Sequence, residues 1–350
     1  MQTRVLGRTG VQVSEYCLGA MMFGPWGNPD HDDCARMTHR ALDAGINFID
    51  TADMYSAGES EEIVGKAIKG RRDEVVLATK FHGPMGADPN MRGNSRRWIL
   101  REVENSLRRL DTDWIDLYQV HRPEEATAVD ETLGALSDLV HQGKIRYLGS
   151  STFPAEYVVE AQWVAERRGR ERFVCEQPPY SILVREIERS LLPTCARYGM
   201  GVIPWSPLAG GYLTGKYRKG VDPPKDSRLG RGFGSQFEDE RRRRVHEERL
   251  DAVEELLKVA ADAGCSLTHL AIAFVLEHPA VTSAIIGPRT MEQLDDLLAG
   301  AEVRLDADVL DRIDDIVPAG TSISGPDPWQ PDALRRRNRR RARLIPKSGN

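Results

Sequence analysis

Four residues within the first 121 positions have side chains that together could protonate an oxygen atom: Asp50, Tyr55, Lys80 and His121. A free tyrosine has a pKa of about 10, which is too high for efficient proton donation near neutrality. A cation within about 4–6 Å lowers such a pKa by about 1–3 units, which gives Lys80 a role, and Asp50 supplies its counter-charge. His121 can polarise a carbonyl oxygen through a hydrogen bond. None of the four is a plausible nucleophile in this arrangement, so we expect a cofactor to attack the carbon.

The elements that must position these residues are short apolar runs alternating with amphipathic stretches. Nearly continuous hydrophobic runs are typical of parallel strands that are buried on both faces. The predicted strands are Tyr16–Gly19, Asn47–Asp50, Val75–Thr79, Ile115–Gln119, Tyr147–Ser150, Val174–Gln177, Gly201–Trp205 and Ala284–Ile286. The predicted helices are Asp32–Ala44, Ser60–Ile68, Ser95–Leu110, Asp130–Gln142, Pro154–Arg168, Glu188–Tyr198, Asp239–Ala263, Ser266–Glu277 and Thr290–Ala299.

Residues that favour helix ends support these boundaries. Ser60 precedes an acidic first turn and Asp130 begins another, which predicts two helix N-termini. Gly45, Gly143 and Gly199 each follow a predicted helix, as C-terminal capping glycines do.

Eight strand and helix units in series have two compact arrangements, an open doubly wound sheet and a closed (β/α)8 barrel. A doubly wound dinucleotide fold has Gly-x-Gly-x-x-Gly after its first strand, whereas this chain has Leu-Gly-Ala-Met-Met-Phe-Gly at residues 18–24. The sequence therefore predicts an α/β protein with a (β/α)8 TIM barrel over residues 1–325. Residues 1–13 are expected to form an N-terminal hairpin that plugs the barrel, and residues 208–236 and 317–331 to form long loops after strand seven and near the C-terminus.

In such a barrel the active site lies at the C-terminal ends of the strands. Asp50 ends the second predicted strand, Lys80 lies at the end of the third and His121 just after the fourth, while Tyr55 comes five residues after Asp50. Three neighbouring strands thus bring an acid, an amine and an imidazole to one mouth, with the phenol beside them. We interpret this convergence as an active site.

Composition excludes several other classes of protein. Hydrophobic residues make up 40% of the chain, the longest apolar run is Leu270–Leu276, and the start lacks the apolar core of a signal peptide. Five scattered cysteines without a Cys-x-x-Cys pair argue against a disulfide framework or a zinc site. We therefore expect a cytoplasmic protein that binds neither membrane nor metal.

The charge is unevenly distributed. Residues 331–350 carry +7, which leaves −12 on the rest of a chain whose net charge is −5, and we assign residues 326–350 to a basic C-terminal tail. The tail could attract an acidic partner such as nucleic acid, or it could fold back on its own acidic body. The absence of aromatic residues among these arginines favours the second reading, so no nucleic-acid partner is predicted.

The segment from Asn47 to Ala67, together with Lys80 and His121, closely resembles the aldo-keto reductases. The resemblance extends from about residue 3 to about residue 300, and it is strongest to the branch with potassium-channel β subunits and bacterial general-stress or sugar-related reductases. It implies a catalytic tetrad in which Tyr55 is the general acid, Lys80 tunes Tyr55, Asp50 orients Lys80 and His121 positions the carbonyl. The attacking group is then the hydride of NADPH.

The resemblance also implies where the cofactor and the substrate bind. Thr152 stands where the family usually has Asn, and Leu297 where it often has an adenine-binding Asn. A guanidinium at a helix N-terminus suits a 2′-phosphate, so Arg289 favours NADP over NAD. The implied substrate positions are Met22, Trp26, Tyr55, Phe81 and His121. The implied cofactor positions are Gly19, Met21, Asp50, Ser151, Thr152, Gln177, Trp205, Ser206, Pro207, Leu208, Gly210, Lys216, Gly287, Arg289, Gln293 and Asp296.

Three functions follow from this interpretation. The leading hypothesis is an NADPH-dependent oxidoreductase that reduces the carbonyl of a small aldehyde or ketone. An alternative enzyme would reduce the enone or keto group of a nucleotide-linked sugar. A third possibility is a non-catalytic, redox-sensing NADPH-binding subunit, but the family's channel subunits have a different residue in place of His121. The oligomeric state stays open.

Overall fold

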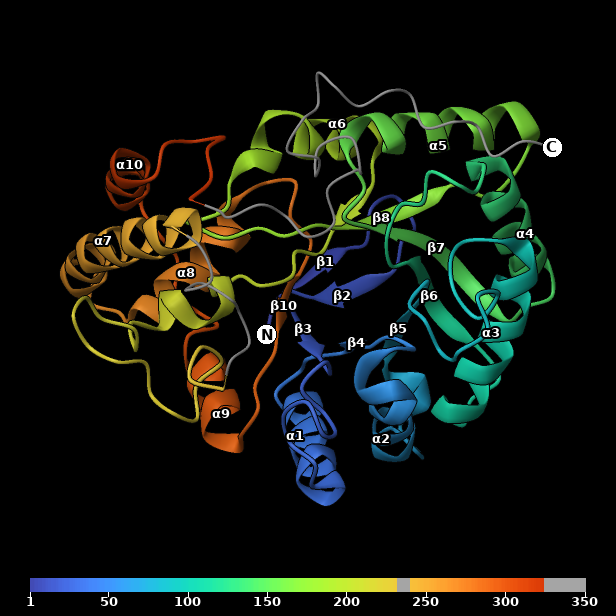
Figure 1. Cartoon of the computed structure of the whole chain (residues 1–350), viewed down its shortest axis with the longest axis horizontal. Helices are drawn as coiled ribbons and strands as arrows, with labels where there is room; N and C mark the ends of the chain where they lie inside the picture. The colour runs from blue at the N-terminus through green and yellow to red at the C-terminus, as the bar shows by residue number, and fades with distance from the viewer. Residues whose placement is uncertain (232–239, 324–350) are drawn as a thin grey trace.

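The computed structural model describes residues 1–231 and 240–323, and its centre is a closed barrel of parallel strands (Figure 1). The strands lie in the order β10-β3-β4-β5-β6-β7-β8-β9. Between β9 and β10 the Ile285 amide donates to the Pro204 carbonyl at 3.0 Å and Val202 pairs with Val281, which closes the ring. The strands are β3 (Tyr16–Gly19), β4 (Phe48–Asp50), β5 (Val76–Phe81), β6 (Ile115–Val120), β7 (Ile145–Ser151), β8 (Phe173–Gln177), β9 (Gly201–Val202) and β10 (Ala284–Ile286).

Helices surround this barrel, as Figure 1 shows. The N-cap side chains of Asp30, Ser95, Ser266, Thr290 and Asp306 each accept a hydrogen bond from a backbone amide in the first turn, which explains where five of the helices begin. The helices are α1 (His31–Asp43), α2 (Glu59–Ala67), α3 (Arg96–Leu110), α4 (Val129–His141), α5 (Ala155–Arg168), α6 (Leu191–Tyr198), α7 (Glu240–Asp262), α8 (Leu267–Glu277), α9 (Met291–Ala299) and α10 (Ala307–Ile316). In residues 1–231 and 240–323 no single helix is long and apolar enough to cross a membrane, and α7 and α8 reach that length only as a pair bent by 89°.

The N-terminal residues form the expected hairpin, with β1 (Thr3–Val5) antiparallel to β2 (Gln12–Ser14). Leu6 and Val13 are fully buried in the apolar cluster inside the barrel, together with Cys17 and Phe48. Gly7 has φ +57°, and a Cβ there would lie 2.8 Å from two backbone carbonyl oxygens of the barrel. The hairpin therefore closes the end opposite the predicted active site, and its turn requires glycine.

The barrel interior changes from apolar to polar toward the C-terminal ends of the strands. Phe48, Leu117 and Cys175 belong to the interior apolar cluster. Two residues further along β4, β6 and β8, on the same face, come Asp50, Gln119 and Gln177, all buried. The polar side chains thus form one layer at the mouth of the barrel.

Several local predictions need correction. Ser60 does not cap α2, because Gly58 precedes the helix and the Ser60 hydroxyl donates to the Ala20 carbonyl at 2.7 Å instead. Helix α4 begins at Val129 rather than Asp130. Gly199 takes the predicted left-handed C-cap conformation with φ +65°.

Other corrections concern the C-terminal half. Strand β9 is only two residues long, and helix α10, which packs against α7, was not predicted. The loop after β9 contains a short 3₁₀ segment, Ala209–Thr214. The rest of that loop beyond residue 231 and the basic tail, residues 326–350, lie outside the described residues.

Candidate active site

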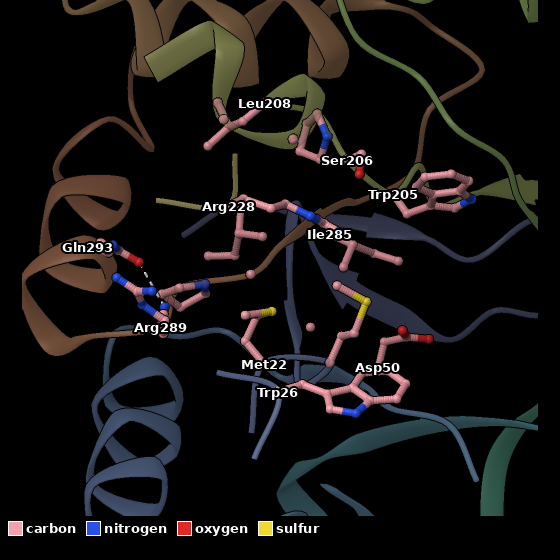
Figure 2. Close-up of a pocket in the computed structure, with 18 of the residues that line it drawn as sticks. Met22, Trp26, Asp50, Trp205, Ser206, Leu208, Arg228, Ile285, Arg289 and Gln293 are labelled. Atoms are coloured by element: carbon pink, nitrogen blue, oxygen red, sulfur yellow. Dashed lines mark hydrogen bonds between the residues drawn. The ribbon is translucent and has the colours of Figure 1, made fainter. Parts of the chain in front are cut away.

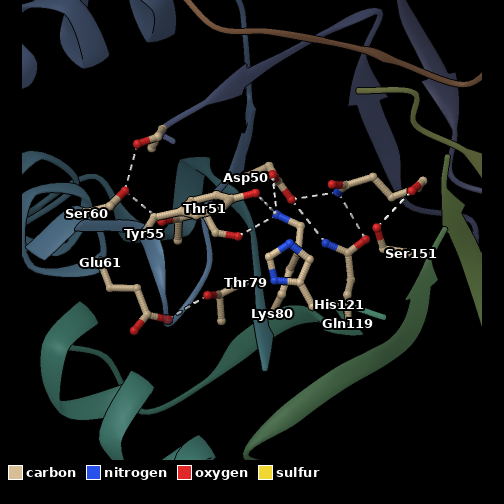
Figure 3. A network of polar contacts seen from close by, with 12 residues as sticks. Asp50, Thr51, Tyr55, Ser60, Glu61, Thr79, Lys80, Gln119, His121 and Ser151 are labelled. Carbon is tan, nitrogen blue, oxygen red and sulfur yellow. Dashed lines mark hydrogen bonds and ion pairs between the residues drawn. The ribbon is translucent and has the colours of Figure 1, made fainter. Parts of the chain in front are cut away.

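Lys80 lies at the centre of the four predicted catalytic side chains (Figure 3). Its Nζ donates to Asp50 Oδ2 at 2.6 Å, to the Thr51 carbonyl at 2.7 Å and to the Tyr55 hydroxyl at 3.3 Å. The Lys80 side chain is fully buried. The ammonium therefore connects the carboxylate to the phenol within hydrogen-bonding distance.

The surroundings of Lys80 keep it charged. Burial alone would lower the pKa of the amine, but the Asp50 carboxylate and the Tyr55 oxygen outweigh burial and raise it above the ordinary value. A permanently charged ammonium beside the phenol favours the negative charge that develops there when Tyr55 gives up its proton.

His121 completes the site from the end of β6. Its ring lies 5.7 Å from the Tyr55 ring between centroids, at an interplanar angle of 82°. Burial, followed by the nearby charges of Lys80 and Arg122, holds the pKa of His121 well below its usual value. Within the part of the chain that the structure describes, its Nδ1 has no hydrogen-bond partner. A neutral imidazole with unused hydrogen-bonding capacity suits a group that holds a carbonyl oxygen without competing for its proton.

A tight turn after β4 places the phenol. The Asp53 amide donates to the Lys80 carbonyl at 3.0 Å, and Ser56 Oγ donates to the Phe23 carbonyl at 3.0 Å. Ser56 and Ala57 adopt φ values of 49° and 57°, which L-residues rarely do.

Further strained residues follow other strands at the same mouth. They are His82 after β5, Thr152 after β7, and Ser206 and Ala209 after β9. Among described non-glycine residues with positive φ, only Asp111, at the end of α3, lies away from this region. Backbone strain is thus concentrated where the catalytic side chains meet.

A cavity of about 750 Å³ opens directly above these side chains (Figure 2). Its wall contains three of the four tetrad residues, Asp50, Tyr55 and His121, and it also contains Met22 and Trp26. The other predicted residues in its wall are Gly19, Met21, Ser151, Gln177, Trp205, Ser206, Pro207, Leu208, Gly210, Lys216, Gly287, Arg289, Gln293 and Asp296. The fold thus brings these predicted residues, which are far apart in the sequence, to one cavity.

Three predicted residues lie outside the cavity wall. Lys80 is buried just beneath it, and the Thr152 hydroxyl accepts a hydrogen bond from Arg122 at 3.0 Å. Phe81 was expected to line the substrate pocket, but it is fully buried and packs against Tyr118 with ring centroids 4.9 Å apart. Because successive residues of a strand face opposite ways, Phe81 points away from the interior that Lys80 occupies.

Cationic side chains line part of the cavity wall. Lys216 and Arg228 face it, and in residues 1–231 and 240–323 neither forms an ion pair. Arg289 donates to the Asp226 carbonyl at 2.8 Å and pairs with the Asp226 carboxylate at 3.5 Å, and its own backbone amide donates to Gln293 Oε1 at 2.8 Å (Figure 2). These cationic side chains suit the phosphates of a dinucleotide.

Sequence reasoning missed some members of the wall, notably Met54, Arg228 and Ile285. It also missed Gln119, whose amide contacts Asp50. For Gln119 a signal existed, because it lies two residues before His121 and so shares its face of the strand. For Arg228 there was no signal beyond its place in a long loop.

This combination of a (β/α)8 barrel, a buried lysine–carboxylate pair under a tyrosine and a cation-lined cavity defines a barrel oxidoreductase. Residues 15–318 match the Aldo/keto reductase family. The chain belongs to this family, whose members typically use NAD(P)H and act on small carbonyl compounds.

Three relatives illustrate the range of the family around this chain. An uncharacterized oxidoreductase, YrpG, of Bacillus subtilis is 41% identical over 91% of this chain and 96% of its own length. A probable voltage-gated potassium channel subunit beta of Oryza sativa is 37% identical over 91% of this chain and 97% of its own. The aldo-keto reductase YhdN of Bacillus subtilis is 37% identical over 85% and 88%.

Proposed function

We propose that this chain is an NADPH-dependent reductase of small aldehydes or ketones, with Tyr55 as the general acid. The observation that carries the proposal is the Lys80 ammonium, 2.6 Å from Asp50 and 3.3 Å from the Tyr55 hydroxyl, directly below the cavity. Bound NADPH would supply the hydride. The side chains of the protein would supply the proton and orient the carbonyl.

Each side chain has a separate task in this reaction. The neutral imidazole of His121 donates a hydrogen bond to the carbonyl oxygen and so fixes its position beside Tyr55. The Tyr55 hydroxyl gives its proton to that oxygen as negative charge develops on it. Lys80 stabilises the phenolate that is left, and Asp50 keeps Lys80 in place.

The residues of the cavity fit the cofactor. Trp205 offers an indole face for a planar ring, and Ser151 and Gln177 offer polar atoms near it. Lys216 and Arg228 would meet the pyrophosphate region, and Arg289, next to the start of α9, would meet a 2′-phosphate. That position of Arg289 supports NADPH over NADH.

The substrate end of the cavity is largely apolar. Trp26 lies 6.1 Å from Tyr55 between ring centroids, and Met22 and Met54 line the same region. Such a wall accepts an aryl or alkyl carbonyl compound. The nucleotide-sugar alternative relies on the basic tail, which lies outside the described residues.

The test is NADPH oxidation with a panel of small aldehydes and ketones, in wild type and in Tyr55→Phe. We expect wild type to oxidise NADPH and Tyr55→Phe to lose about 10²–10⁴-fold in kcat, since that range is typical of general acid catalysis. NADPH affinity, measured by fluorescence titration, should be unchanged. Wild type that binds NADPH but turns over no carbonyl compound would instead support a non-catalytic NADPH-binding subunit.

A further inference from the structure

The Asp50 carboxylate is held by two buried amides as well as by Lys80 (Figure 3). Gln119 Nε2 donates to Asp50 Oδ1 at 3.1 Å, and Gln177 Nε2 donates to the same oxygen at 2.8 Å. Gln177 Nε2 also lies 3.3 Å from Gln119 Oε1, which accepts from it. Lys80 takes the other carboxylate oxygen, Oδ2, at 2.6 Å. Both oxygens of Asp50 are therefore engaged, from three different strands.

Glycine at position 149 leaves room for the Gln119 side chain in the barrel interior. Gly149 on β7 faces Gln119, and a Cβ at Gly149 would lie 2.8 Å from Gln119 Cγ and 3.2 Å from Leu117 Cδ1. Gln119 itself is fully buried. Burying a polar amide next to the apolar cluster that contains Leu117 is costly unless its hydrogen bonds are made, so its function must be sought in those bonds.

We propose that Gln119 is a positioning residue: through Asp50 it holds the Lys80 ammonium under Tyr55, and through Gln177 it orients the amide that faces the cofactor cavity. Because Gln177 Nε2 is engaged by Asp50 and Gln119, the Gln177 Oε1 is the atom turned to other partners. A hydrogen-bond acceptor at that point suits the NH2 group of a carboxamide on the bound cofactor. This inference rests on the proposed reduction, since it concerns the same side chains.

The charge on Lys80 should depend on this arrangement. The titratable groups around Lys80 are Asp50 from β4, Tyr55 from the following turn, His121 from the end of β6 and Cys17 from β3. Of these, Asp50 does most to oppose the effect of burial, which lowers the pKa of Lys80. Without Gln119, Asp50 Oδ1 loses a donor and the carboxylate can turn from Lys80, so the pKa of Lys80 should fall.

The experiment compares two variants that disturb Gln119 with one matched control. Gln119→Leu removes the amide at similar volume, and Gly149→Ala displaces Gln119 by crowding its Cγ. Gln162→Leu is the control, because Gln162 is a buried glutamine on α5, outside the barrel, where its Nε2 donates to the Phe173 carbonyl at 2.8 Å. The measurements are kcat, KM and their pH profiles, NADPH affinity by fluorescence, and the Lys80 side-chain titration by NMR on isotope-labelled lysine.

We expect Gln119→Leu to lower kcat by about tenfold to a hundredfold, which is typical when a catalytic group is displaced by a fraction of its contact distance. The KM for the carbonyl compound and the NADPH affinity should change much less. The Lys80 resonance should titrate at lower pH than in wild type, and the alkaline limb of kcat should move in the same direction. Gly149→Ala should show the same signs with smaller size, and Gln162→Leu none of them.

Two outcomes would overturn the inference. One is that Gln119→Leu lowers stability in urea as Gln162→Leu does but leaves kcat and the Lys80 titration as in wild type. The other is that its kcat falls while Lys80 titrates as before. The NMR titration needs no turnover, so it tests Gln119 even if wild type reduces no carbonyl compound, and that failure would count against the proposed function alone.

Discussion

Strands β5 and β6 bury charged and polar groups on both of their faces, and the two faces differ. On the inner face, Lys80 and Gln119 meet Asp50 beneath the cavity. On the outer face, Thr79 and Tyr118, the residues directly before them, lie beside a second buried cluster. This outer cluster consists of the buried residues Asp53, Glu61, Glu102, Thr79 and Tyr118 and the partly buried Arg109.

The inner network balances its charges, whereas the outer cluster does not. Arg109 donates to Glu61 Oε2 and to Glu102 Oε1, both at 2.6 Å, so one guanidinium serves two carboxylates. Over the described ranges, Asp53 Oδ2 and the Tyr118 hydroxyl have no hydrogen-bond partner. Burial, then the nearby Glu61 and Glu102, raise the pKa of Asp53 well above its usual value, so we expect it to be protonated.

The inner network and the outer cluster differ in their access to the cavity, whereas shifted pKa values occur in both. Asp50 and Tyr55 line the large cavity, and no member of the outer cluster does. A buried charge cluster with shifted pKa values is therefore compatible with a purely structural role. The comparison predicts that the inner network controls catalysis and the outer cluster controls stability.

The largest effect should come from removing the inner cation. Lys80→Met leaves the Asp50 carboxylate without its cationic partner and the Tyr55 phenol without its neighbouring charge. We expect kcat to fall by about 10²–10⁴-fold, the range for loss of a group that supports proton transfer, as measured by NADPH oxidation. A folded Lys80→Met variant with nearly normal kcat would contradict the prediction that the inner network controls catalysis.

Arg109→Met is the matched change on the outer face. It leaves Glu61 and Glu102 buried without a counter-charge, and breaking a buried pair in this way costs about 3–5 kcal/mol. Urea unfolding should show that loss, while kcat of the remaining folded protein stays close to wild type. A loss of kcat without a loss of stability would place the outer cluster in catalysis.

Much of this organisation could be predicted from the sequence, because strands that are apolar throughout and catalytic residue types at their ends are local signals. The barrel, the hairpin and the meeting of Asp50, Tyr55, Lys80 and His121 follow from them. What failed depends on side-chain direction and on long-range contacts. Phe81 was placed in the pocket although its neighbour Lys80 points inward, so strand alternation alone would have excluded it.

Contacts between distant segments were the hardest to foresee. Ser60 resembles an N-cap by its position before acidic residues, but its hydroxyl bonds the Ala20 carbonyl, 40 residues away in the chain. The outer cluster was not predicted at all, because it joins one residue after β4 with residues of α2 and α3. No local pattern marks such a combination.

The pH dependence of stability should also distinguish the two faces. In the folded protein Asp53 keeps its proton above the pH at which an unfolded aspartate, with a pKa of about 3.9, loses it. The unfolded state then binds fewer protons at this residue, so the contribution of Asp53 to the free energy of unfolding of wild type falls as pH rises above that value.

In wild type the Met54 amide donates to Asp53 Oδ1 at 2.6 Å. Asp53→Asn has no proton to lose, and its side-chain oxygen can still accept this hydrogen bond. Urea unfolding from pH 4 to pH 8 should show this variant equal to wild type at the acid end and increasingly more stable above it. Parallel curves for the two proteins would mean that Asp53 is ionised in the folded state.

The smallest effect concerns strain at the rim of the inner network. Thr152 follows β7 with φ 59°, a conformation that a β-branched residue adopts at a cost and that asparagine tolerates better. The Thr152 hydroxyl accepts from Arg122 at 3.0 Å, and an asparagine side-chain oxygen can accept the same bond. Thr152→Asn should therefore raise the free energy of unfolding by about 0.5–1 kcal/mol, a fraction of the usual cost of such strain. Thr112→Asn serves as the control, because the partly buried Thr112 hydroxyl also accepts from an arginine, Arg72, at 3.1 Å, but Thr112 does not have a positive φ. If Thr152→Asn is no more stable than wild type in urea, the positive φ at residue 152 costs threonine no more than it costs asparagine.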